Sequence, residues 1–504
     1  MAMVYNPTDP NSILDYAKKM IGKTFYDILE EYEQRKESTT VAEDDKGSIY
    51  YAKSHARKNY KGGMGNLVEE RYFEYKANSD ENPDFPKAGV ELKVTPYKTV
   101  GKNNELRAKE RLILTMIDYF KLVQEKSFEE SHLWHKCHLM LLVWYLYIKG
   151  MDKLNYRIDY VDFFIPSDED LAIIKNDYYK IVAKVKAGKA HELSEADTLY
   201  LGAATKAADS TKRRKQPFSD IEAKPRAFSL KNSYMTYVLN HYYINKDFFI
   251  HEKSDKQSCT PNQKNHGTTL RKDNIFPSGF NGDFESNVIA KINKYRNYTT
   301  EQLCRIFGLE YRNGKRPKNL ESILAFRMLG IKGNHAEEFT KANVVVKAIR
   351  IEANGKIKQS MSFPTFKFTD IVAQTWEEST LANYLKETRF FFVVYRYKTD
   401  GKLYLKGAQF WNIPYKDLEI EVRSVWERTK AIIQNGLEFY VDEKGKRHNN
   451  LPKSTDNYVC HVRPHGRDAK DTYPLPDGRE YTKQCFWLNK NYILSQISND
   501  LKED

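Results

Sequence analysis

The sequence predicts a chain of the α/β (α+β) class that is built as a tandem duplication. Segments with the apolar spacing of helices alternate with short apolar segments typical of strands. A length of 504 residues exceeds one ordinary hydrophobic core, and two stretches of the first half recur in the second. We therefore expect an N-terminal domain over residues 1–244, a linker or excursion over 245–283, and a C-terminal domain over 284–504.

The net charge and the cysteines indicate what kind of partner and which compartment the protein has. The 81 Lys and Arg residues exceed the 68 Asp and Glu residues, and the net charge of +13 suits a polyanionic partner such as nucleic acid. The 5 cysteines are scattered and form no CxxC pair, which indicates a reducing compartment. The first residues lack the pattern of a signal peptide, and no stretch reaches the ~18 apolar residues that span a bilayer. We expect a cytoplasmic protein without a membrane partner.

The N-terminal segment is predicted to be helical. Residues 12–33 have helical periodicity with a turn near Gly22, so these helices should pack beside a sheet. A polar loop then leads to a basic glycine turn that contains Lys61 and Gly62. The helix that follows this turn carries Glu69 in its first turns.

The segment from 83 to 93 sets two acids and a lysine at a spacing that chemistry can use. Residues 90–94 are predicted to form a strand, whose alternation puts Glu91 and Lys93 on one face. Asp84 can fold over to meet them across a turn. Two carboxylates at one strand end can hold a divalent metal, while a neighbouring ammonium can orient a water and offset phosphate charge. The pattern alone is also typical of a solvated strand face.

Further elements follow along the first half. Strands are expected over residues 111–115 and 139–147, and a helix over 168–187. Three histidines and Cys137 crowd together just before the second of these strands, which suggests zinc at first sight. We expect them at a strand entrance rather than on a helix, and no second ligand pair follows at finger spacing, so zinc is the minority interpretation.

A polar segment over residues 207–224 contains four successive cations, Lys212, Arg213, Arg214 and Lys215. Such a run is usually a solvated loop. It is also suited to contact the phosphates of a nucleic acid.

The second half repeats the first. Residues 338–347 align without a gap with residues 84–93, and residues 486–490 align with 228–232, at offsets of 254 and 258 residues. Two matches in the same order and at nearly the same separation indicate a diverged tandem duplication.

These motifs resemble MutH, the GATC-specific mismatch-repair endonuclease of the PD-(D/E)xK nuclease superfamily, in order, spacing and individual residues. The length and the repeat are still more similar to the Sau-type restriction endonucleases, which cut at GATC and contain two MutH-like units in one chain. The resemblance covers most of the chain. It implies a mixed sheet flanked by helices in each half, a type II site-specific deoxyribonuclease that cuts before G, and Mg²⁺ as cofactor.

The resemblance also implies roles for single residues. Asp84, Glu91 and Lys93 occupy the catalytic triplet of the family. Glu69 matches its helix acid near the metal, and Lys136 its second lysine beside the scissile phosphate. Asp84, Glu91 and Glu69 would therefore ligate the metal.

Several cations fall where the family contacts DNA. Lys61 and Gly62 match the Lys-Gly pair that approaches DNA. The basic run lies between two MutH-like pieces that contain Lys206 and Lys231 and that flank DNA-facing loops in the family. The base-reading Arg-Pro and tyrosine of the family are missing from this half, where Ser229 takes the tyrosine position. How the first half reads its sequence is left open.

The second half has the opposite combination. Val345 takes the place of Glu91 and has no oxygen for a metal, whereas the base-reading Arg-Pro is present as Arg463 and Pro464. Arginine can make bidentate hydrogen bonds to guanine in the major groove. Lys490 ends the repeated piece and is also expected to contact DNA. The resemblance implies a domain that reads DNA without cutting it; the alternative is that Arg463 pairs with an acid at the surface.

The preferred hypothesis is a restriction endonuclease that makes double-strand cuts in duplex DNA containing GATC, with a possible dimer on DNA. A DNA methyltransferase of the same system would be a functional partner. Two alternatives stay open: a MutH-type nickase of mismatch repair, against which the second copy argues, and a non-cutting DNA-binding regulator, against which the intact triplet argues.

Overall fold

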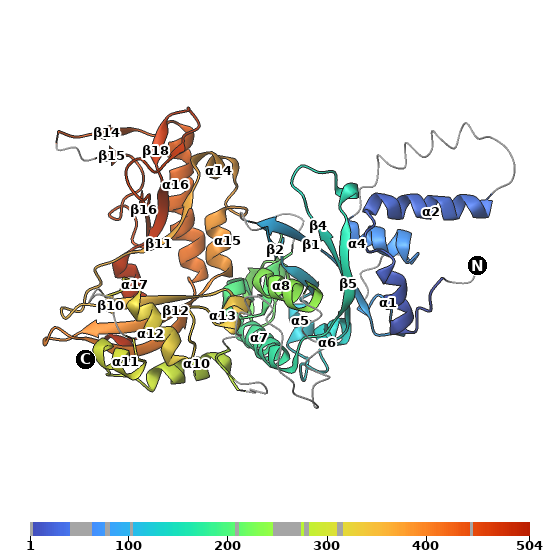
Figure 1. The fold of residues 1–504 in the computed structure, drawn as a ribbon, viewed down its shortest axis with the longest axis horizontal. Coiled ribbons are helices and arrows are strands. Elements are labelled where there is room, and N and C mark those ends of the chain that lie inside the picture. Colours follow the sequence, from blue (N-terminus) through green and yellow to red (C-terminus); the bar gives the residue numbers. More distant parts are fainter. Residues whose placement is uncertain are drawn as a thin grey trace, which may run out of the picture. The chain divides into compact units, whose positions relative to one another are not determined.

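The computed structural model describes residues 4–40, 63–75, 81–100, 104–206, 211–244, 274–276, 282–309, 316–443 and 447–503. The chain divides into two compact units (Figure 1). The first contains Met1–Leu171, Val182–Ala190 and Ala203–Gly267, and the second contains Ala172–Ile181, His191–Gly202 and Thr268–Asp504. The predicted domain boundaries at 244 and 284 stay a prediction, and most of the predicted linker lies outside the described residues.

A mixed four-stranded sheet forms the centre of the first half. Its order is β2-β1-β4-β5, from β1 (Glu91–Val100), β2 (Glu105–Ala108), β4 (Met140–Leu146) and β5 (Ile158–Phe164). Strands β1 and β4 run parallel, and the other neighbours run antiparallel. The predicted strands at 90–94 and 139–147 are confirmed, and β1 runs six residues beyond the predicted end at Val94, to Val100.

Helices cover one face of this sheet. Leu92, Leu141 and Val143 are buried in one core with Ile13 of α1 (Pro10–Lys18) and Ile28 of α2 (Phe25–Thr40). The predicted helical segment with a turn near Gly22 is confirmed, since Gly22 has a φ of +87° between the two helices. Because side chains alternate across a strand, burial of Leu92 here directs Glu91 and Lys93 to the other face.

A second, three-stranded sheet has the order β3-β9-β6, from β3 (Leu112–Met116), β6 (Leu201–Thr205) and β9 (Arg226–Leu230). A hairpin of β7 (Arg214–Gln216) and β8 (Ser219–Ala223) lies in the sequence between β6 and β9. The remaining helices of this half are α4 (Met64–Leu67), the π-helical turn η1 (Val68–Tyr72), α5 (Tyr119–Leu122), α6 (His132–Cys137), η2 (Lys153–Asn155), α7 (Asp168–Lys186), η3 (Ala190–Glu192), η4 (Glu195–Asp197), α8 (Asn232–Val238) and η5 (Leu239–Ile244). The predicted helix over 168–187 is confirmed.

The second half contains two sheets with the same pattern. Their orders are β10-β12-β13, from β10 (Val344–Ile351), β12 (Arg389–Tyr397) and β13 (Leu403–Trp411), and β11-β19-β16, from β11 (Met361–Phe366), β16 (Cys460–Pro464) and β19 (Gln484–Leu488). Two hairpins are β14 (Phe439–Val441) with β15 (Arg447–Asn449), and β17 (Thr472–Pro474) with β18 (Glu480–Thr482).

The helices of the second half are α10 (Phe284–Asn293), α11 (Thr300–Ile306), α12 (Leu320–Met328), α13 (Glu337–Ala342), α14 (Phe368–Ala373), α15 (Thr380–Glu387), η7 (Asp417–Val422), α16 (Arg423–Gln434), α17 (Lys490–Gln496) and α18 (Asn499–Lys502). Strand β10 runs parallel to β12, which runs antiparallel to β13, just as β1, β4 and β5 do. This shared order is compatible with the tandem duplication that the repeats indicate.

One local expectation was wrong. His132 and His135 lie on helix α6 and His138 is its C-cap, whereas the sequence placed all three at a strand entrance. The Ser131 hydroxyl accepts a hydrogen bond of 3.1 Å from the Trp134 N–H and thereby caps the first turn. A helix of six residues is too short to show a helical period in the sequence.

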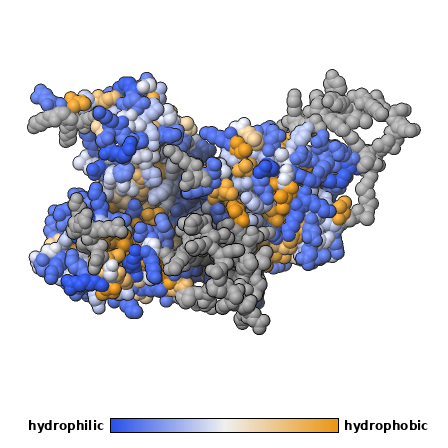
Figure 2. All heavy atoms as spheres, in the orientation of Figure 1, coloured by the Kyte–Doolittle hydropathy of each residue, from blue (hydrophilic) through white to orange (hydrophobic). Residues whose placement is uncertain are grey.

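Hydrophilic side chains predominate on the face that Figure 2 shows. In the parts of the chain that the structure describes, no helix has the length and apolar character needed to cross a membrane.

Candidate active site

A tight loop brings Asp84 back to the start of β1. The Phe85 N–H donates to the Val90 carbonyl over 2.9 Å, and the Val90 N–H donates to the Phe85 carbonyl over 3.3 Å. Gly89 closes the loop with a φ of +67°, and a Cβ there would lie 3.2 Å from Nε2 of His138. Only glycine meets both conditions easily. The loop thus places Asp84, which precedes Phe85, beside Glu91, which follows Val90.

The two carboxylates of the triplet meet at this point. The Asp84 N–H donates to Oε2 of Glu91 over 3.2 Å, and the Leu92 N–H donates to Oδ2 of Asp84 over 2.9 Å. Glu91 is only 2 % exposed. Burial and the neighbouring Glu91 carboxylate raise the pKa of Asp84 to about 7, against the opposing hydrogen bond from Leu92.

Two lysines hold the Glu91 carboxylate. Nζ of Lys93 donates to Oε1 over 2.7 Å, and Nζ of Lys136 on α6 lies 3.6 Å from Oε2. Lys136 also donates to the Asn82 carbonyl over 3.0 Å. Burial lowers the pKa of Lys93, but Glu91 and other nearby groups outweigh it, so the net pKa is raised. Lys93 is therefore a firmly cationic group in this arrangement.

Glu69 joins the same electrostatic cluster from the π-helical turn η1. Burial raises its pKa, Lys93 lowers it, and the Glu91 carboxylate raises it again. All five side chains that the sequence singled out for catalysis are thus brought together: Asp84, Glu91, Lys93, Glu69 and Lys136.

The carboxylates fit a hard divalent cation. Mg²⁺ is usually held by one or two carboxylates and several waters, and Asp84 with Glu91 supplies such a pair. Burial and then the nearby Glu91 carboxylate raise the pKa of Asp84, and a bound cation would offset both effects. In the described portion of the chain, no group of three or more His, Cys, Asp and Glu residues has an arrangement that could hold a metal ion. Both Glu91 oxygens face lysines, which must turn aside from an incoming ion.

Two further groups at this site were not predicted from the sequence. The Tyr75 hydroxyl is buried and has no hydrogen-bond partner among the residues described, and its pKa is raised by burial and then by Asp84. The Asn82 carbonyl fixes the Lys136 ammonium. The closeness of Asn82 to Asp84 in the sequence is a weak hint, and for Tyr75 only the folded chain provides a signal.

The residues of the first half that were predicted to contact DNA differ in whether the structure describes them and in how exposed they are. Lys61 and Gly62 lie outside the described residues. Lys206 is exposed just after β6, and its N–H donates to the Pro225 carbonyl over 2.9 Å.

The basic run and Lys231 also differ from each other in exposure. Lys212 and Arg213 are exposed before β7, and Arg214 and its neighbour Lys215 are exposed on that strand, so the run enters a hairpin. Lys231 is only 3 % exposed and is the N-cap residue of α8.

The predicted reader residues of the second half lie at the end of β16 and the start of α17. Arg463 and Pro464 are exposed, and the Arg463 guanidinium lies 4.6 Å from the ring centroid of Trp487. Arg463 and Lys490 line one cavity of about 740 Å³. Within the described ranges, Arg463 has no carboxylate at ion-pair distance, so the alternative that it pairs with a surface acid finds no partner there.

Three comparisons place the chain among known proteins. The family described as DNA mismatch repair enzyme MutH matches residues 73–177. The type II restriction enzyme Sau3AI of Staphylococcus aureus is 34 % identical over 483 residues, which are 88 % of this chain and 93 % of that enzyme. The DNA mismatch repair protein MutH of Vibrio campbellii is 26 % identical over 244 residues, which are 47 % of this chain and 96 % of that protein.

Proposed function

Because the chain belongs to the family of MutH-like type II restriction endonucleases, we propose that it makes Mg²⁺-dependent double-strand cuts in DNA at GATC, before the G. The observation that carries the proposal is the convergence of Asp84 and Glu91 with the ammonium groups of Lys93 and Lys136. Two carboxylates and two cations in one buried cluster suit hydrolysis of a phosphodiester.

Each residue has a role in this proposal. Asp84 and Glu91 would hold the ion, and Glu69 would assist directly or through a water. A bound Mg²⁺ would supply Lewis-acid polarisation of the phosphate and lower the pKa of a water. Lys93 positions the attacking water; its raised pKa in the metal-free state makes it a poor base there. Lys136 faces the growing negative charge of the transition state.

The second half reads DNA and assists without cutting. Val345 on β10 stands where Glu91 stands on β1, and it has no metal-binding oxygen. Glu338, which aligns with Asp84, accepts the backbone N–H groups of Ile275 and Phe276, over 2.8 Å and 3.3 Å to Oε1. The Glu338 carboxylate is thus already occupied by hydrogen bonds from backbone N–H groups. Arg463 supplies the donor pair for a guanine edge.

Two other functions have less support. A mismatch-repair nickase would need only one MutH-like unit, whereas similarity to the restriction enzyme spans 88 % of this chain and similarity to a MutH protein spans 47 %. A non-cutting regulator would have no use for the assembled triplet. A functional DNA methyltransferase partner, a cytoplasmic location and a dimer on DNA complete the proposal.

One experiment separates the three functions. A supercoiled plasmid with several GATC sites is incubated with the purified protein and Mg²⁺, and a parallel sample receives EDTA. Linear fragments that end at GATC support the restriction enzyme. Nicked circles alone support the nickase, and retarded but intact plasmid supports the regulator. End-labelled duplexes with and without methylated GATC then locate the cut and its sensitivity to methylation.

A further inference from the structure

In the second half, Lys347 occupies the position that Lys93 has in the first. Among the described residues, it has no neighbour that corresponds to the Glu91 carboxylate, which pairs with Lys93. Lys347 pairs with Phe392 of the parallel strand β12, as Lys93 pairs with Leu142 of β4. The residue two positions before Lys347 on the same strand face is Val345, which carries no charge.

The Lys347 ammonium is poorly solvated and uncompensated. Burial alone lowers its pKa, and no neighbouring carboxylate raises it. In the described parts of the second half, no acid lies at ion-pair distance from its Nζ. A half-buried ammonium in this state is a favourable partner for an incoming anion.

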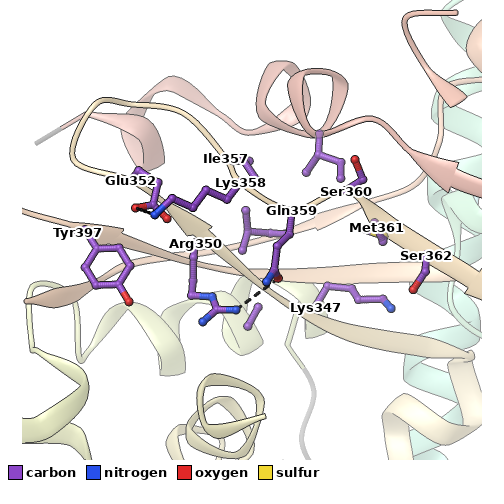
Figure 3. A pocket seen from close by; sticks show the side chains of 13 residues that line it. Lys347, Arg350, Glu352, Ile357, Lys358, Gln359, Ser360, Met361, Ser362 and Tyr397 are labelled. Atoms are coloured by element: carbon purple, nitrogen blue, oxygen red, sulfur yellow. Dashed lines mark hydrogen bonds and ion pairs between the residues drawn. The ribbon is translucent and has the colours of Figure 1, made fainter. Parts of the chain in front are cut away.

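The ammonium lines a cavity of about 570 Å³ (Figure 3). Its one acidic lining residue, Glu352, is engaged by Lys358, whose Nζ lies 2.8 Å from Oε2. Arg350 donates to Gln359 over 3.3 Å, the contact dashed in Figure 3. In that view Lys347 and Glu352 lie at opposite ends, and the Lys347 nitrogen lies at the end where Ser362 is labelled. The cavity therefore presents a free cation and small polar groups.

This cavity adjoins the one that contains the predicted base reader. The two share lining residues from Lys358 to Ser360 and Ser362, and the second continues to Arg463 and Lys490. The adjoining cavities thus place Lys347, Arg463 and Lys490 along one continuous surface. Such a row of cations suits an extended polyanion better than a single small anion.

We propose that the Lys347 cavity binds a backbone phosphate of duplex DNA without a metal ion. This inference rests on the proposed reader role of the second half and names the site that supplies its phosphate contact. In the first half, the clustered carboxylates of Glu69, Asp84 and Glu91 repel a phosphate until a cation neutralises them. In the second half, Val345 removes that repulsion. DNA binding by the second half therefore persists in EDTA, whereas tight binding at the cutting site requires a divalent cation.

The test uses the full chain and a fluorescently labelled GATC duplex in EDTA, with binding followed by anisotropy. Lys347→Met keeps the length of the side chain and removes its charge, and we expect the affinity to fall about tenfold. Lys347→Arg should stay close to the parent protein. Lys356→Met is the matched control, because Lys356 is exposed in the same segment between β10 and β11 but lines neither cavity, and its loss should leave the affinity close to that of the parent.

Two readouts separate a phosphate contact from other effects. Lys347→Met should weaken GATC and scrambled duplexes equally and reduce the salt dependence of binding by about one phosphate. An unchanged melting temperature excludes misfolding. Affinity in EDTA that does not respond to Lys347→Met overturns the inference. If Arg463→Ala still removes sequence preference in that case, the proposed reader role survives; if neither variant has an effect, the reader role fails as well.

Discussion

Nζ of Lys93 donates a 2.7 Å hydrogen bond to Oε1 of Glu91, two residues earlier on the same strand. In the proposed function, this pair joins a metal-binding oxygen to the cation that positions the attacking water. In the second half the same two strand positions are Val345 and Lys347, where the carboxylate is gone and the ammonium remains. Together with Glu338 in place of Asp84, this change separates the proposed cutting site from the proposed binding site.

Glu91→Ala should abolish cleavage, with a loss of at least about a hundredfold, because it removes a proposed metal ligand and the carboxylate that both ammonium groups contact. Asp84→Ala should have the same effect. Cleavage of a GATC duplex is measured in single-turnover reactions with Mg²⁺. Glu105→Ala on β2 is the control, since Glu105 is 57 % exposed and pairs with the exposed Arg107. Near-normal cutting by either triplet variant would mean that the active site lies elsewhere.

In the metal-free protein, deprotonation of Asp84 should lower the free energy of unfolding as pH rises toward neutrality. Its folded-state pKa of about 7 is above the unfolded value of ~3.9, so the folded state binds more protons between them. The stabilisation is complete below about pH 4 and is lost as pH rises through about 7.

Asp84→Asn mimics the protonated acid and should flatten this part of the pH profile. In EDTA, its melting temperature at about pH 8 should exceed that of the parent, by about 2–4 °C for each kcal/mol of relief. Scanning calorimetry over the range provides the measurement. Parallel profiles for the two proteins would refute the assignment of this pH dependence to Asp84.

Replacement of Lys212, Arg213, Arg214 and Lys215 with Ala should weaken DNA binding and lower its salt dependence by up to about four phosphates. The run is exposed and enters the β7–β8 hairpin, which suits contact with a backbone. Binding constants are measured across a series of salt concentrations. A slope equal to that of the parent would return the run to the status of a solvated hairpin edge.

Arg463→Ala should remove the preference for GATC over scrambled duplex at a cost of ~1–3 kcal/mol, while nonspecific binding survives. Because Trp487 lies against this guanidinium at 4.6 Å, the side chain is held in place before DNA arrives. The full-length variant should also cut more slowly, although Arg463 belongs to the half without the triplet. Unchanged preference together with unchanged cutting would leave the second half without a reader role.

Much of the candidate active site could be predicted because it is local. Strand alternation alone puts Glu91 and Lys93 on one face, and the short segment with Gly89 between Asp84 and Glu91 forces a turn that makes the two acids meet. The proposal that the second half holds no metal follows from Val345. These features depend on backbone periodicity and side-chain chemistry, which the order of residues determines by itself.

Contacts between distant segments were decided only by the tertiary structure. Lys136 reaches Glu91 because Ser131 caps a six-residue helix that the sequence did not indicate, and that helix carries the ammonium to the start of β1. Burial of the Tyr75 hydroxyl beside the carboxylates depends on packing. So does the cavity at Lys347, which is lined by β10, by the segment that leads into β11, and by Tyr397 of β12 and Ile493 of α17. A local pattern specifies which face a side chain takes, whereas its partners, its burial and its pKa arise from elements that meet only when the chain folds.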